Sequence, residues 1–208
     1  MTADQVAALL ALDLSPWWRA WIVLAVSCGL RPGELHGLRW ADTADGVITV
    51  RQSLKLERGR ERGRIVAAEL KTPWSRRTLE MPAMAAAVLA VLRRAQAAER
   101  LKAGGDWEHH DLVFAGPYGR PLWPQDINRG LKALCQRAGL GRDWQPRETR
   151  HTFVSALSDS GVDIERIADA VGHVNSSVTR TVYRHSLADK ITETATVMDR
   201  IYPAGGVQ

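Results

Sequence analysis

Cysteine and long apolar runs are both scarce in this 208-residue sequence. The two cysteines, Cys28 and Cys135, lie in apolar periodic segments, so we expect small buried side chains and no disulfide framework. The apolar stretch at residues 21–30 is too short to cross a bilayer. The N-terminus is acidic at its start and has no basic region ahead of an apolar run, unlike a signal peptide. These absences predict a cytoplasmic protein with no membrane segment.

A strong excess of one charge is also lacking, and so is a spaced set of metal ligands. Lysine and arginine total 28 against 23 acidic residues, and the formal net charge of +5 favours a polyanionic partner only mildly. His109 and His110 lie among acidic residues, but adjacent loop residues chelate poorly and no spaced histidine or cysteine completes a site. We therefore expect no metal and no other cofactor.

The sequence does contain clear helix signals from its first residues. Thr2 and Gln5 form a capping box that predicts a helix as far as about residue 12. Ser15 and Pro16 are typical of a helix start, and Gly29 of a helix end. The segment between them is apolar on nearly all faces, which predicts a central, buried helix.

Residues 46–82 interrupt the helical pattern. Three short segments there, GVITVRQSL, RIVAAEL and RRTLEMP, have the composition of strands and are separated by charged and turn residues. Helices are predicted again after Pro82 and, beyond a loop with one short strand (DLVFAG), at 124–138, 148–160, 163–171, after Asn175 and at 188–202. The expected fold class is mainly α with a small antiparallel β-sheet insert (α+β).

Four motifs place basic residues at predicted turns or helix ends. In chain order these are Arg31 in GLRPGEL, Lys71 in ELKTPWS, Arg147 and Arg150 in PRETRHTF, and His173 in VGHVNSSVTRTVYRH. The last motif also carries Tyr183, ten residues after its histidine. Arg147 and Arg150 are three residues apart, which places them on one face of a helical turn.

Phosphodiester exchange is one reaction that would use all of these residues. An attacking phenol must lose its proton, because the pKa of free tyrosine is about 10. Arg31 and Arg150 would clamp the charge that develops on the phosphate, since the guanidinium fork matches phosphate and stays charged. Lys71 would act as general acid toward the departing 5′ hydroxyl. Tyr183 is the preferred nucleophile, because neither of the other two tyrosines follows a Gly-His pair.

The order and spacing of GLRPGELHGLRW, LKTPWSRRTLEMP, RETRHTFVS and VGHVNSSVTRTVYRH resemble the tyrosine recombinase (phage-type integrase) family. The resemblance covers residues 2–202 and corresponds to the family's catalytic domain. It implies a tyrosine recombinase/integrase catalytic-domain-like fold and site-specific DNA cleavage and rejoining through a 3′-phosphotyrosine intermediate at Tyr183. Because the ester conserves the bond energy, the resemblance implies an enzyme that needs neither a metal nor ATP.

The resemblance also implies a role for each matching residue. The matched set is Tyr183 as nucleophile, Arg31 and Arg150 as phosphate clamp, Lys71 as general acid, His173 as acid, base or phosphate contact, and Glu34 as supporting acidic residue. Arg147 departs from the pattern, since the family usually has histidine at that position. Arginine cannot deprotonate usefully, so proton abstraction would fall to His173, to water or to a rearranged group. Arg147 itself would contact a DNA phosphate or form a structural ion pair.

Two alternative functions stay open at this point. The arginine at position 147 is the reason to consider a catalytically impaired DNA-binding module, although we interpret it as a variant active site. The shared chemistry also allows a topoisomerase-like strand relaxer.

The resemblance implies a partner and a domain layout as well. We expect double-stranded DNA as the partner, with a monomer in solution and a homotetramer on DNA. The predicted layout is a catalytic domain at 1–187 and a C-terminal helical tail at 188–208, with the family's N-terminal core-binding domain absent. The tail has an apolar stripe that would pack either on a neighbouring protomer or on its own domain.

Overall fold

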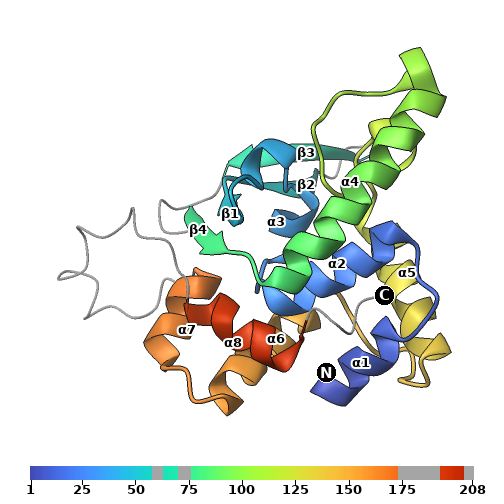
Figure 1. Cartoon of the computed structure of the whole chain (residues 1–208). Helices are drawn as coiled ribbons and strands as arrows, with labels where there is room; N and C mark the ends of the chain where they lie inside the picture. The colour runs from blue at the N-terminus through green and yellow to red at the C-terminus, as the bar shows by residue number, and fades with distance from the viewer. Residues whose placement is uncertain (58–62, 70–75, 173–192, 204–208) are drawn as a thin grey trace.

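A computed structural model describes residues 1–57, 63–69, 76–172 and 193–203 (Figure 1). The helices of this part are α1 (Ala3–Leu10), α2 (Pro16–Ser27), α3 (Pro32–His36), α4 (Ala83–Ala103), α5 (Pro124–Arg137), α6 (Glu148–Asp159), α7 (Ile164–Val171) and α8 (Glu193–Ile201). The strands are β1 (Val47–Val50), β2 (Gln52–Glu57), β3 (Arg64–Glu69) and β4 (Arg77–Glu80), with short 3-10 turns η1 (Trp40–Asp42), η3 (Gly104–Asp106) and η4 (Pro117–Gly119). The predicted fold class, mainly α with a small antiparallel β component, is confirmed.

The buried helix predicted from the sequence is α2, and it forms the centre of the core. Its start is capped by the Ser15 hydroxyl, which accepts a hydrogen bond from the backbone N–H of Trp18. Residues 20–26 are all fully buried, so the helix has no solvent face along this stretch. Helices α4 and α6 both pack against it. The apolar pattern therefore predicted both the helix and its central position.

The expected capping box and the expected buried cysteines are present. Thr2 accepts from the backbone of Gln5, whose side chain accepts from the Thr2 backbone at the start of α1. Cys28 and Cys135 are both buried and free. Burial raises the pKa of the Cys28 thiol to about 12, so this group stays protonated and unreactive.

The β insert consists of two small antiparallel ladders. Strand β1 pairs with β4, with Ile48 opposite Leu79, and β2 pairs with β3, with Leu54 opposite Ala67. Helix α3 packs on β2, and Figure 1 shows these strands gathered around α3 at one end of the molecule. The insert thus lies directly beside the helix that follows Arg31.

The strand predicted at DLVFAG is wrong. The structure has only two isolated bridges there, Arg39 with Leu112 and Ala115 with Pro121. Asp111 adopts a positive φ of 57°, which breaks an extended run before it starts. The apolar side chains Val113 and Phe114 are nevertheless buried. The apolar composition of this segment therefore predicted its burial correctly, but its strand conformation incorrectly.

The C-terminal helix packs in cis on the chain's own core. Helix α8 contacts α4, α6 and β4, and its Met198 is fully buried. An ion pair joins Arg166 of α7 to Glu193 at the start of α8, with Nε and Oε2 2.9 Å apart. The part of the predicted apolar stripe that lies in α8 is thus covered within the single chain. Among the described residues, no helix combines the length and apolarity needed to cross a membrane.

Candidate functional site

Arg31 stands immediately before α3 and is oriented by Glu34. The Glu34 carboxylate accepts hydrogen bonds from the Arg31 backbone N–H at 2.9 Å and from its guanidinium Nη1 at 2.7 Å. The side chain of Arg31 is 39% exposed, whereas that of Glu34 is 2% exposed. A buried carboxylate therefore holds a guanidinium whose outer part still reaches solvent.

Arg150 is a buried residue of α6 that bridges the ends of two other helices. Its Nη1 donates to the carbonyl oxygen of Gly29 at 2.7 Å, and its Nη2 donates to that of Val171 at 2.5 Å. Gly29 has a φ of +60°, and a Cβ there would lie 2.5 Å from a ring carbon of Phe153 on α6. Glycine is required at this position because it allows the end of α2 to approach α6 this closely.

Arg77 of β4 is a third arginine of the site, and the sequence interpretation missed it. It is buried, with Nη2 2.9 Å from Glu34 Oε2 and Nε donating to the carbonyl oxygen of Ala170 at 2.7 Å. The available signal was strand alternation, because Arg77 shares a face of β4 with the buried Leu79. An arginine on the inward face of a strand needs a buried anionic partner.

These three arginines together bind the C-terminal end of α7. Arg77, Arg150 and Arg31 donate to three consecutive carbonyl oxygens, those of residues 170, 171 and 172 respectively. The last carbonyls of a helix have no intrahelical partner and form the negative end of its dipole, so guanidinium donors stabilise them. Gly172 closes the helix in the left-handed conformation, with a φ of 63°. The three guanidiniums thus fix residues 170–172, the last ones before residue 173.

The electrostatics of this cluster favour an added anion. Arg31 and Arg77 pair with the carboxylate of Glu34, whose charge also acts on Arg150. Burial alone would raise the pKa of Glu34, but Arg77 and Arg31 hold it below its ordinary value. Burial, together with the charges of Arg31 and Arg77, lowers the pKa of Arg150 to about 9, which leaves it charged at neutral pH. A phosphate bound here would offset this repulsion and match the planar forks.

Arg147, the residue in place of the usual histidine, lies just outside this cluster. It is exposed and directly precedes α6, one helical turn before Arg150. Among the described residues it makes no ion pair, although Glu148 follows it directly and accepts from the backbone N–H of Gln145. The expectation of a structural ion pair therefore finds no support in the described part of the chain.

Three of the predicted site residues, Lys71, His173 and Tyr183, lie outside the described residues. The two other tyrosines do lie within them. Tyr118 is in η4, which packs beside α4, and Tyr202 is buried, where desolvation raises the pKa of its phenol. Neither donates to nor accepts from the arginines that bind α7.

The sequence matches the phage integrase family over residues 1–190. An integrase of Streptomyces ambofaciens is 38% identical over 99% of this chain and 54% of its own length. A XerC-like tyrosine recombinase of Caldanaerobacter subterraneus subsp. tengcongensis is 27% identical over 88% of this chain and 49% of its own length. The chain thus spans about half the length of the curated relatives that it matches.

Solved structures share the fold at low identity. The integrase of transposon Tn1549, in complex with transposon right-end DNA, has a TM-score of 0.66 at 18% identity, covering 96% of this chain and 58% of its own. The catalytic core of lambda integrase has a TM-score of 0.54 at 19% identity, covering 83% of this chain and 94% of its own. The fold is that of tyrosine recombinase catalytic cores, and the chain belongs to the phage integrase family.

Proposed function

We propose that this chain is the catalytic domain of a site-specific DNA recombinase, with Tyr183 as nucleophile and Arg31 and Arg150 as the phosphate clamp. One observation carries the proposal. The guanidiniums of Arg31, Arg77 and Arg150 converge on the end of α7, directly before the segment that contains His173 and Tyr183. A phosphate held at these guanidiniums would lie beside the start of the segment that supplies the nucleophile.

The proposed step exchanges one phosphodiester bond for another. The phenol oxygen of Tyr183 attacks the phosphorus, a bond from tyrosine to phosphorus forms, and the bond from phosphorus to the 5′ oxygen breaks. The phenol proton passes to His173 or to water, and the departing 5′ oxygen takes a proton from Lys71. The attack of the free 5′ hydroxyl on the phosphotyrosine reverses these transfers and reseals a strand. Net charge is conserved throughout, and no bond energy is lost.

The described arginines keep donors for the non-bridging oxygens. Arg150 uses Nη1 and Nη2 for one carbonyl each, and a guanidinium has five N–H groups in all. Arg31 is partly exposed and uses one donor for Gly172 and one for Glu34. Fixed donors of this kind contribute most when charge develops in the transition state. Arg77, by contrast, is buried and directs all three of its nitrogens at Glu34 and α7, and we propose that it positions the other two.

Covalent trapping on DNA tests the proposed function. Wild-type protein is mixed with a library of nicked duplexes that carry random sequence around the nick, and complexes that survive detergent are recovered and sequenced. We expect wild-type protein to give such complexes on a shared sequence, and Tyr183→Phe to give none. Peptide mapping of the trapped wild-type protein should place the modification on Tyr183.

The alternative functions give different results in the same assay. A wild-type protein that shifts duplex DNA but forms no covalent complex would be a binding module, in line with the arginine at position 147. Relaxation of supercoiled plasmid without a shared sequence would indicate a topoisomerase-like activity. A complex that persists in Tyr183→Phe would overturn the choice of nucleophile.

Assembly and location complete the proposal. We propose that the protein acts in the cytoplasm, is a monomer alone and forms a tetramer on DNA, with α8 packed in cis before assembly. Analytical ultracentrifugation with and without a trapped duplex tests this, and a monomer on saturating DNA would contradict it.

A further inference from the structure

A second group of arginines lines a cavity next to the β insert. This cavity, of about 300 Å³, is lined by Arg39, Arg51, Gln52, Ala67, Ala68 and Arg76. We call it the outer basic pocket. Of the described residues that line it, three are arginines and one is glutamine, and the two alanines belong to β3.

A buried carboxylate orients two of these arginines. Asp42 is 4% exposed at its side chain, and its Oδ2 accepts from Arg39 Nε at 2.9 Å while its Oδ1 lies 2.9 Å from Arg51 Nε. The closest contacts therefore use the Nε atoms, which lie at the inner end of each guanidinium. Arg39 Nη2 also donates to Asp42 Oδ1, at 3.4 Å. The side chains of Arg39 and Arg51 are 37% and 60% exposed, so both reach solvent, and Arg51 does so the more.

Surface ion pairs of this exposure contribute little stability on their own. A single carboxylate also cannot satisfy the donors of two guanidiniums. Asp42 pairs with both cations, and the charge of Asp111 also acts on Arg39. An anion at the outer ends of the two guanidiniums would offset the repulsion that remains between them. The planar fork of arginine matches a phosphate group better than it matches water.

The pocket and the arginine cluster at α7 are joined by short stretches of chain. Arg76 lines the pocket, and the next residue, Arg77, points into the cluster around Glu34. On the other side, α3 carries Glu34, and Asp42 follows it in η1. The Gln52 side chain donates to the carbonyl oxygen of Gly37 at 2.8 Å, so β2 is fixed against the end of the same helix.

We propose that the outer basic pocket binds a backbone phosphate of duplex DNA, separate from the phosphate that reacts with tyrosine. The inference rests on the proposed function only in taking DNA as the partner. The pocket contributes affinity and register and takes no part in bond breaking, because backbone contacts position a protein on DNA without reading its sequence.

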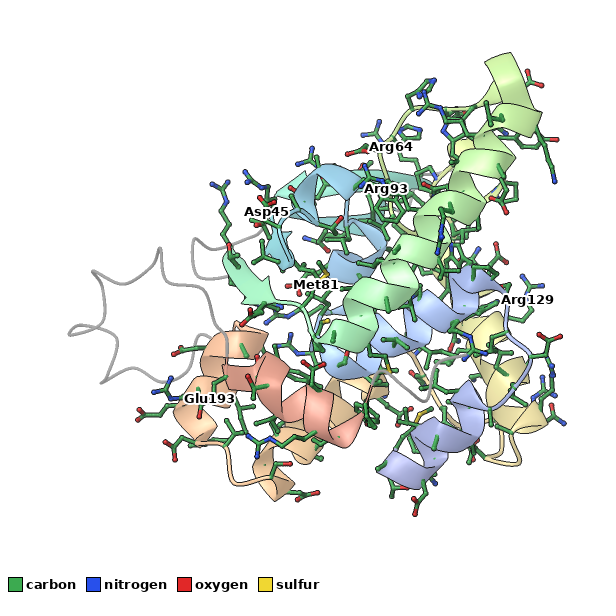
Figure 2. All side chains as sticks on the ribbon, viewed as in Figure 1. Asp45, Arg64, Met81, Arg93, Arg129 and Glu193 are labelled. Carbon is green, nitrogen blue, oxygen red and sulfur yellow. The ribbon has the colours of Figure 1, made fainter. Side chains whose placement is uncertain are left out.

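Salt-dependent binding to a short fluorescent duplex of mixed sequence tests the pocket. Each phosphate neutralised contributes about 0.9 to the slope of log affinity against log salt. We expect Arg51→Gln to lower that slope by about 1 and to weaken binding about five- to tenfold near 0.1 M salt. Arg129→Gln is the matched control, because Arg129 is also exposed and paired with a carboxylate, Asp126, but lies on α5 across the molecule from the strands (Figure 2).

A second variant separates an oriented pocket from general charge attraction. Asp42→Asn makes the protein more positive, so general attraction predicts tighter binding to DNA. An oriented pocket predicts weaker binding, about threefold, because the two arginine forks lose the carboxylate that holds them. Equal effects of Arg51→Gln and Arg129→Gln, or tighter binding by Asp42→Asn, would overturn the proposal.

Trapping distinguishes this proposal from the proposed function. If the wild type forms covalent complexes but Arg51→Gln leaves the salt slope unchanged, the outer basic pocket is contradicted and the recombinase function is supported. If Arg51→Gln lowers the slope but the wild type forms no covalent complex, the pocket is supported and the recombinase function is contradicted.

Discussion

Two arginine groups in this molecule have the same design at different depths. In each, one buried carboxylate pairs with two arginines, Glu34 beside α7 and Asp42 beside β2. The carboxylates are equally hidden, with side chains 2% and 4% exposed. One arginine of each pair is alike, since the side chains of Arg31 and Arg39 are 39% and 37% exposed. The second arginine differs, since Arg77 is 5% exposed and Arg51 is 60% exposed. The depth of this second arginine decides how far the ion pair supports the fold.

The physical reason is the cost of leaving a charge without its partner. A buried guanidinium that loses its carboxylate cannot recover hydration, and the loss destabilises the fold strongly. An exposed guanidinium in the same position turns to water at little cost. The two groups should therefore respond very differently to the same chemical change.

The largest expected effect is that of Glu34→Gln. The change keeps the shape but removes the charge that pairs with buried Arg77, close to buried Arg150. We expect the free energy of unfolding to fall by about 4 kcal/mol, measured by urea denaturation at neutral pH. Glu34→Asp keeps the charge and should restore part of the loss. A fall no larger than that of Asp42→Asn would show that depth does not separate the two groups.

Arg150→Lys should show that the inner group also performs chemistry. Lysine keeps the charge but loses the fork that spans the carbonyl oxygens of Gly29 and Val171. We expect covalent trapping to slow by about 100-fold or more, with duplex affinity within about threefold of wild type. Arg129→Lys, on exposed α5, should change neither quantity. Equal losses of trapping and of affinity would indicate that Arg150 has a structural role.

Much of the inner group was predictable because its signals are local. The turn GLRPGEL pointed to Arg31, to which the family resemblance added Glu34, and the spacing in PRETR placed Arg150 on a helix, where the structure has it. Ser15 and Gly29 likewise predicted the limits of α2. Each of these signals depends on neighbours within one helical turn or one chain reversal.

The remaining features depend on contacts between distant parts of the chain. Arg77 reads as an ordinary strand charge until β4 packs against α7, 93 residues away in sequence. The pairing of Asp42 with Arg51 depends on how η1 approaches the start of β2. The apolar run DLVFAG is buried as a loop, because its backbone bonds to residues 38 and 40 instead of to a strand. The hydrophobic periodicity of the sequence predicts that such positions are buried, but it does not identify the residues that they contact.

The stability of the fold should depend on pH through His36, on helix α3 between the two groups. His36 of α3 is buried, its Nε2 accepts from Trp21 Nε1 at 3.1 Å, and burial lowers its pKa to about 4 from an ordinary 6.5. The unfolded state therefore binds more protons between these values, so stability is complete above pH 6.5 and is lost as pH falls toward 4. The difference between the two pKa values of His36 corresponds to about 3 kcal/mol in the free energy of unfolding.

Urea denaturation at a series of pH values measures this effect. His36→Gln keeps an acceptor for Trp21 and should flatten the dependence between pH 4 and 6.5. Protonation of Glu34 lowers the stability further only below pH 4.5, the ordinary pKa of glutamate, because its pKa is lowered in the fold. A slope that persists in His36→Gln would assign the effect to another group.

The smallest expected effect completes the comparison. Asp42→Asn should lower the free energy of unfolding by about 1 kcal/mol or less, because Arg39 and Arg51 both reach solvent when the carboxylate charge is lost. The measurement is the same urea titration that is used for Glu34→Gln, so the two values are directly comparable. If Asp42→Asn instead costs as much as Glu34→Gln, then Asp42 supports the fold, and the weaker DNA binding of this variant would no longer report on orientation. The binding of Arg51→Gln, at a side chain 60% exposed, would then be the deciding measurement for the outer basic pocket.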